Sequence, residues 1–226
     1  MSIGLEATTA STGVFHSWLS LPRDDAQATK TINYIIISNI IWFLMFFGVG
    51  HLHPFPAKIE SMLKKPYDKL VLRHRLVQMY HGVVAWSMAI YWHITVNDRS
   101  CSKRISDLEL AMLVNTSAHF IWDMAFMQYH GFLDTGNLIH HLMGIATYYF
   151  TAFAQYNHNL LCLNILPAEF SNINMHLREV YKRLGMRYTW AYYLNEYQYC
   201  FTYIVCRSIW IPICYYWMYT CETVNP

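Results

Sequence analysis

Six stretches of mostly apolar residues recur along the 226-residue chain, each with about the 20 residues that a helix needs to cross a bilayer. They cover approximately residues 32–50, 72–94, 109–128, 137–155, 159–178 and 198–219. Most of them lack the single polar face that a surface helix of a soluble protein shows. The sequence therefore predicts an all-α fold, a polytopic membrane helix bundle of about six transmembrane helices.

Composition supports a membrane protein with one domain. Charged residues make up 13% of the chain, against about 25% in ordinary soluble domains. No linker-like segment divides the chain, so we expect a polar N-terminal extension at 1–31, one bundle at 32–219 and a C-terminal tail at 220–226. The net charge of +2 is too small to indicate nucleic acid as a partner.

The distribution of basic residues predicts which loops share a side of the membrane. With six spans, the loops at 51–71 and 179–197 lie on one side. Together with the adjoining helix ends they hold most of the chain's 16 lysines and arginines. The positive-inside rule places this basic side in the cytosol, or in the matrix if the membrane is mitochondrial. Both termini would then lie on the opposite side.

Ionisable side chains interrupt the apolar stretches at similar depths. Those in the half of the bilayer nearer the basic loops are His81, Asp123, His140, His141, Glu169 and Arg207. Polar neighbours extend them along single helical faces. His119 precedes Asp123 by four residues, and Asn172 and His176 follow Glu169 at i+3 and i+7. Because lipid offers such faces no hydrogen-bond partner, we expect them to line a polar cavity inside the bundle that opens toward the basic side.

Structural roles are open for the same residues. The adjacent His140 and His141 could hydrogen-bond across helices or to lipid headgroups, and Arg207 could pair with Glu169 or Asp123, as buried charges usually do. No metal is expected. The HxxxH and HxxHH boxes of membrane di-iron hydroxylases are missing, and adjacent histidines point apart on a helix.

Five segments occur in an order that is specific as a set. They are RLVQMYHGVVAW (75–86), FIWDMAFMQYHGFLD (120–134), LIHHLMGIATYY (138–149), AEFSNINMHLREVYKRLG (168–185) and YIVCRSIWIP (203–212). This set resembles the TLC domain, which ceramide synthases share with the translocating-chain-associating membrane protein and several small lipid-related proteins. The resemblance covers about residues 32–219. It implies transmembrane helices around a central cavity, and the endoplasmic reticulum as the location.

The resemblance also implies a chemistry. In ceramide synthases the paired histidines are regarded as catalytic in the transfer of a fatty acyl group from acyl-CoA to the amine of a long-chain base. Carried over, it implies catalytic His140 and His141 supported by Asp123, with acyl-CoA as co-substrate and no bound cofactor. The chain departs from that branch at residues 166–177, LPAEFSNINMHL, which lack a further acidic His-Asp stretch. It is more similar to the small TLC-domain proteins.

Three functions follow as hypotheses. The first is a protein that binds or acts on lipid, related to acyl chains or sphingolipids, with the cavity lined by His81, His119, Glu169, Asn172, His176 and Arg207. The second is a non-catalytic accessory subunit of a large membrane complex that keeps the TLC fold and a structural lipid. A respiratory assembly in the mitochondrial inner membrane is an example. The third is a chaperone or cargo receptor for other membrane proteins. The expected partners are membrane lipids and, for the second hypothesis, other membrane subunits.

Overall fold

The computed structural model describes residues 25–63, 65–97, 103–154 and 158–220, and all regular structure in these ranges is helical. The elements are α2 (Asp25–Phe43), η1 (Leu44–Val49), α3 (Gly50–Leu52), α4 (Ala57–Met62), α5 (Pro66–Thr95), α6 (Asp107–Tyr129), α7 (Thr135–Ala154), α8 (His158–Arg183), α9 (Trp190–Tyr203), η2 (Ile204–Trp210) and α10 (Ile211–Thr220). The π-helical segments η1 and η2 continue their neighbouring α-helices without a break. Most of the predicted N-terminal extension and of the predicted tail lies outside the described residues.

The six predicted spans coincide with long helical segments of the described residues, so the predicted all-α fold is confirmed. The largest difference is at α9, which begins at Trp190 instead of residue 198. The Thr189 side chain caps this helix by accepting a hydrogen bond from the backbone N–H of Tyr192 at 3.3 Å, so the helix extends beyond its apolar part. By length and hydropathy alone, Ala26–Leu52 is the one described segment apolar enough to cross a membrane.

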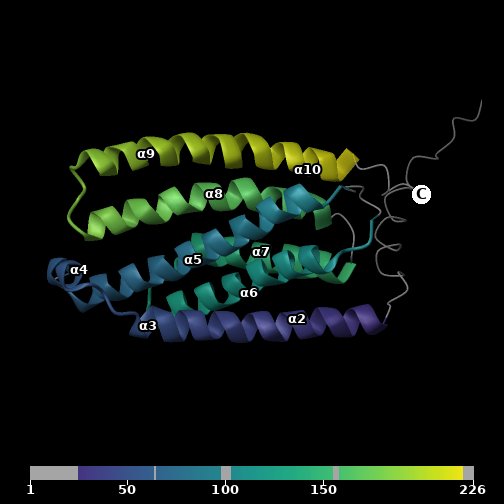
Figure 1. The fold of residues 1–226 in the computed structure, drawn as a ribbon, viewed down its shortest axis with the longest axis horizontal. Helices are drawn as coiled ribbons and strands as arrows, with labels where there is room; N and C mark the ends of the chain where they lie inside the picture. The colour runs from purple at the N-terminus through teal and green to yellow at the C-terminus, as the bar shows by residue number, and fades with distance from the viewer. Residues whose placement is uncertain (1–24, 64, 98–102, 155–157, 221–226) are drawn as a thin grey trace, which may run out of the picture.

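The long helices lie side by side, with α2 along one edge of the bundle and α9–α10 along the other (Figure 1). The helices α5, α6, α7 and α8 fill the space between these edges. The connections around α3 and α4 and between α8 and α9 lie at the same end, as the sequence predicts for the basic loops (Figure 1). The first residues of α2 and the last of α10 lie at the opposite end. Which end of the bundle faces the cytosol or the matrix stays a prediction.

Local signals fix several helix ends around the cavity. At α6 the Ser106 hydroxyl accepts from the backbone N–H of Glu109, while the Glu109 carboxylate accepts from the backbone N–H of Ser106 at 2.8 Å. This reciprocal capping box satisfies two backbone donors of the first turn. At α5, Pro66 occupies the first turn, where its missing N–H costs nothing. Pro167 lies inside α8 and does not end the helix.

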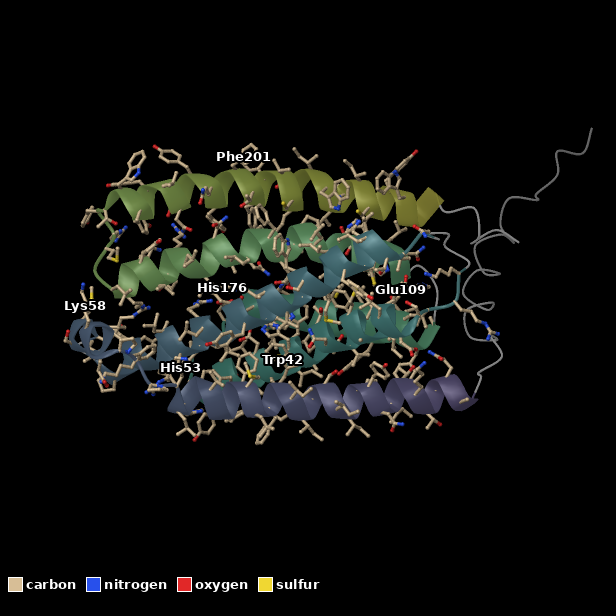
Figure 2. The ribbon with its side chains drawn as sticks, viewed as in Figure 1. Trp42, His53, Lys58, Glu109, His176 and Phe201 are labelled. Carbon is tan, nitrogen blue, oxygen red and sulfur yellow. The ribbon has the colours of Figure 1, made fainter. Side chains whose placement is uncertain are left out.

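Apolar packing forms two clusters along the bundle. One includes Trp92, Leu110 and Leu113, and the other includes Phe46 and Phe126. The end of the bundle opposite the basic loops also holds a buried charge, because Glu109 is fully buried there (Figure 2). Its carboxylate accepts from the Trp92 indole at 2.9 Å and lies 3.3 Å from His158. This buried carboxylate lies outside the polar layer that the sequence predicts in the half nearer the basic loops.

Candidate functional site

A carboxylate in the bundle interior is held by histidines from two other helices. Asp123 on α6 is 4% exposed. Its Oδ1 accepts from Nε2 of His74 on α5 at 2.6 Å, and its Oδ2 lies 2.7 Å from Nε2 of His141 on α7. Hydrogen bonds to an ionised group are short and about twice as strong as neutral ones. Asp123 therefore joins α5, α6 and α7 at one depth.

Both ring nitrogens of His141 are occupied. Nε2 lies against Asp123, and Nδ1 donates to the backbone carbonyl of Asn137 at 2.6 Å. A carbonyl oxygen only accepts, and so does an ionised carboxylate, so both nitrogens need a hydrogen. While Asp123 is ionised, His141 therefore donates from both ring nitrogens. In this arrangement it has no lone pair with which to take a proton.

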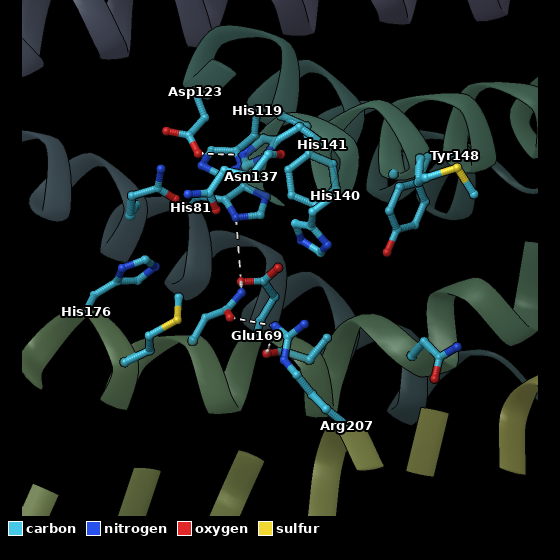
Figure 3. A pocket seen from close by; sticks show the side chains of 18 of the residues that line it. His81, His119, Asp123, Asn137, His140, His141, Tyr148, Glu169, His176 and Arg207 are labelled. Atoms are coloured by element: carbon cyan, nitrogen blue, oxygen red, sulfur yellow. Dashed lines mark hydrogen bonds and ion pairs between the residues drawn. The ribbon is translucent and has the colours of Figure 1, made fainter. Parts of the chain in front are cut away.

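His140 has the opposite environment from its neighbour. Its side chain is exposed, and neither ring nitrogen is hydrogen-bonded to a described residue. Its ring makes edge contacts with Phe120 and His141, at centroid distances of 5.8 and 5.6 Å. It points into the cavity, away from Asp123 (Figure 3). Of the two adjacent histidines, His140 is the one that can act as a general base.

Two further histidines stack in the buried part of the cavity. The rings of His81 on α5 and His119 on α6 are nearly parallel, with centroids 3.7 Å apart and an interplanar angle of 11°. Both are buried, at 2% and 3% exposed, and Trp42 contacts both rings edge-on. Both ring nitrogens of His119 and the Nε2 of His81 lack a hydrogen-bond partner among the described residues. These buried nitrogens are open to a ligand or a water molecule.

A polar relay crosses from α8 to the π-helical segment η2. Glu169 lies 3.6 Å from Nδ1 of His81 and accepts from the Asn172 amide at 3.1 Å. The Asn172 carbonyl accepts from Nη2 of Arg207 at 2.6 Å, and the Ser171 hydroxyl accepts from its Nε at 3.1 Å. The expected direct pairing of Arg207 with Glu169 or Asp123 is therefore wrong. The guanidinium reaches hydroxyl, amide and carbonyl oxygens of α8 because η2 presents it beside them.

A second guanidinium lies nearer the basic end. Nη1 of Arg75 on α5 lies 3.4 Å from Nδ1 of His176 on α8, and the Nε of Arg75 is buried without a hydrogen-bond partner. His176 is 4% exposed. Since Arg75 has only N–H donors, His176 must present its lone pair at Nδ1. The contact is long for a hydrogen bond and leaves most of the Arg75 donors unused.

These groups line one cavity of about 520 Å³ between α5, α6, α7, α8, η2 and α10. All nine predicted site residues are in its wall: His81, His119, Asp123, His140, His141, Glu169, Asn172, His176 and Arg207. Figure 3 labels all of them except Asn172. On α8 the wall extends from Leu161 to Glu179, which is about 27 Å along the helix axis at 1.5 Å per residue. The cavity is therefore elongated. Tyr148 packs against the apolar cluster that holds Leu161, Asn164 lies one turn from Leu161 on α8, and the charged α8 residues of the wall lie between Glu169 and Glu179.

The i, i+4, i+7 spacing of His74, Gln78 and His81 predicts a stripe that faces the bundle interior, and all three residues line the cavity. Sequence reasoning about the site missed Arg75 and Tyr148. Arg75 belongs to the run of basic residues beside the 51–71 loop, so its sequence position predicts a place near the membrane surface. The packing of α5 brings it into the cavity wall. Tyr148 has an ordinary aromatic pattern with no signal for the site.

Among the residues that the structure describes, no three His, Cys, Asp or Glu side chains are placed to hold a metal ion.

The family model of the TLC domain (TRAM/LAG1/CLN8) matches residues 72–225, which include most of α5 and every later described element. No curated protein and no solved structure is significantly similar to the chain.

Proposed function

Because the chain belongs to the TLC-domain family and is therefore an integral membrane protein, we propose that it binds a lipid in this cavity. The acyl chain lies toward Leu161, and the headgroup lies among the histidines, Asp123 and the two arginines. The observation that carries the proposal is the cavity itself, which is elongated and has the charged α8 residues of its wall toward one end, from Glu169 to Glu179. Its volume lies within the roughly 300–1,000 Å³ that is usual for ligand sites.

An opening to the bilayer supports a lipid as the ligand. Met143 on α7 and Tyr215 on α10 line the cavity, yet they are 64% and 55% exposed. They therefore mark two edges of a lateral opening on the outer surface of the bundle, where a transmembrane protein faces lipid. A membrane lipid can enter sideways through this opening without leaving the bilayer.

Buried histidine nitrogens in the cavity wall support a ligand with a polar headgroup. The free nitrogens of His119 and His81 lie in the cavity wall. Leaving a buried donor or acceptor unsatisfied costs about 1–3 kcal/mol. A hydroxyl, amide or amine of a lipid headgroup would satisfy these nitrogens, which gives a ligand with one polar end an advantage over a pure hydrocarbon.

The free lone pair of His140 favours a second, catalytic version of this function, N-acyl transfer from acyl-CoA. The amine nitrogen of a long-chain base would form the new bond to the thioester carbonyl carbon, and the carbon–sulfur bond would break. His140 would take the proton from the amine and return it to the departing thiolate. The Asp123–His141 pair would orient the site. This version predicts that His140→Gln abolishes acyl transfer in an assay with acyl-CoA and a long-chain base, while an active His140→Gln protein excludes it.

A cavity-filling substitution tests lipid binding. Thr147 on α7 lines the cavity, whereas Leu142 on the same helix is 49% exposed and is not part of its wall. We expect the wild-type protein and Leu142→Trp to retain about one lipid per chain after detergent purification, measured by native mass spectrometry. Thr147→Trp should retain none at the same particle size. A lipid-free wild-type protein, or equal retention by Thr147→Trp, contradicts the proposal. A stable particle with fixed protein partners and no lipid would favour the accessory-subunit alternative.

A further inference from the structure

Two guanidinium groups in the cavity wall have no carboxylate partner. Neither Arg75 nor Arg207 has a carboxylate oxygen within 4.0 Å among the described residues. Their hydrogen bonds go to neutral groups of α8: Arg75 to His176, and Arg207 to Ser171, Asn172 and a backbone carbonyl. A charge inside a membrane bundle usually pairs with an opposite charge, because its desolvation is costly. These two cations therefore lack the expected counter-charge.

The carboxylates of the cavity are engaged elsewhere. Asp123 accepts from two histidines. Glu179 accepts from Nε of Arg183 at 3.1 Å. Glu169 accepts from Asn172 and faces His81, so it reaches Arg207 only through the Asn172 amide. None of these three groups forms a direct ion pair with Arg75 or Arg207.

The two guanidiniums lie close enough to share a ligand. Their contacts on α8, His176 and Asn172, are four residues apart, so they lie on the same face of α8 and about 6 Å apart along its axis. Arg75 has its Nε unused, and the Nη1 of Arg207 takes part in none of the bonds to α8. A guanidinium presents paired N–H donors that match the oxygens of a carboxylate or a phosphate.

A third arginine in the cavity wall, Arg178, does pair with a carboxylate. Its Nε donates to Glu196 on α9 at 2.6 Å. The chain therefore supplies a partner for one lining arginine and leaves two without one. Arg178 serves as the internal control for the role of the other two.

We propose that the lipid bound in this cavity carries an anionic headgroup, a carboxylate or a phosphate, held between Arg75 and Arg207. The headgroup supplies the counter-charge that the chain lacks, and the acyl chain extends toward Leu161. This inference rests on the proposed lipid-binding function and narrows its ligand class.

Ligands with one chain and different headgroups test the inference. Radiolabelled hexadecanoate, hexadecyl phosphate and hexadecan-1-ol are bound at pH 7.5 to purified protein in detergent, with acetate and inorganic phosphate as chainless anions. The proteins are the wild type, Arg75→Gln, Arg207→Gln, Arg207→Lys and the control Arg178→Gln. Each variant is first checked for wild-type particle size and melting temperature.

We expect the wild type to bind the two C16 anions at least tenfold more tightly than the alcohol. Arg75→Gln and Arg207→Gln should each lower that preference at least tenfold without weakening alcohol binding. Arg207→Lys should keep part of it, and Arg178→Gln all of it. If Arg75→Gln does not fold, Arg207→Gln and its lysine variant still decide the outcome.

The failures are distinguishable. Equal binding of the alcohol and the anions, or a preference that survives both glutamine variants, overturns the anionic headgroup and leaves lipid binding intact. Chainless anions that bind as tightly as the C16 anions overturn the lipid as the source of the charge. If no C16 ligand binds the wild type, the proposed function itself fails.

Discussion

Replacing Asp123 by asparagine removes the charge that joins three helices while keeping the size of the side chain. The carboxylate takes part in two hydrogen bonds of 2.6 and 2.7 Å, one to His74 and one to His141. Hydrogen bonds to charged groups contribute about 1.5–3 kcal/mol each, and breaking a buried ion pair from one side costs about 3–5 kcal/mol. An asparagine keeps only neutral bonds: its Oδ1 can accept from His74, and its Nδ2 can donate to His141 once the Nε2 of His141 has lost its proton. We therefore expect Asp123→Asn to lower the free energy of unfolding by about 3–5 kcal/mol.

The assay is reversible unfolding in mixed micelles with increasing SDS, followed by tryptophan fluorescence. The matched control is Asp107→Asn, which removes an aspartate at the start of the same helix that pairs with Lys30 on the surface of the bundle. Exposed pairs contribute little, so the control should unfold close to the wild type. If Asp123→Asn is as stable as Asp107→Asn, the carboxylate does not hold α5 and α7 to α6, and the description of the site as a fixed Asp–His unit is refuted.

Two further substitutions test packing and titration. A Cβ at Gly144 would lie 2.5 Å from the Phe120 ring, and one at Gly48 meets nothing within 4 Å. Gly144→Ala should therefore lower the free energy of unfolding by about 1–3 kcal/mol, whereas Gly48→Ala should not lower it; equal stabilities would contradict the close contact of α6 and α7. His130, outside the predicted spans, lies 3.0 Å from His51, and burial, followed by the charge of His51, lowers its pKa below the usual 6.5. The unfolded chain then binds more protons, so stability should fall as the pH drops below about 6.5 and should level off below the folded pKa. His130→Gln should flatten this fall in SDS titrations from pH 7.5 to 5, and an unchanged slope would exclude His130 as its source.

The sequence predicts the helices and the membership of the site well, because both follow from periodic patterns. Apolar length gives the helical segments, and the polar faces of α6 and α8 predict that Asp123 and Glu169 point inward. Those patterns require only that a helix hide its polar side from lipid. They therefore indicate which residues meet, although they do not indicate which atoms bond.

The partners of each side chain were less predictable. Arg207 lies in the π-helical segment η2, where an extra residue per turn changes the direction of its side chain, and it reaches Asn172 instead of a carboxylate. His74 bonds Asp123 because α5 and α6 pack closely at that depth. Glu109 is buried because Trp92 of α5 and His158 of α8 contact it, together with Ser106 at the start of its own helix. A single-helix pattern contains no information about such contacts.

The central claim is that one lipid occupies the interior of this bundle, and photo-crosslinking tests it most directly. A C16 fatty acid with a diazirine in its chain and an alkyne for detection is added to membranes that contain the protein, irradiated, and mapped by peptide mass spectrometry. The account predicts saturable labelling of cavity-lining segments around Tyr148 and Ile211, which excess hexadecanoate suppresses. Labelling confined to the outer face of α2, where Ile37 and Ile40 are exposed, and insensitive to competitor would contradict an internal lipid site.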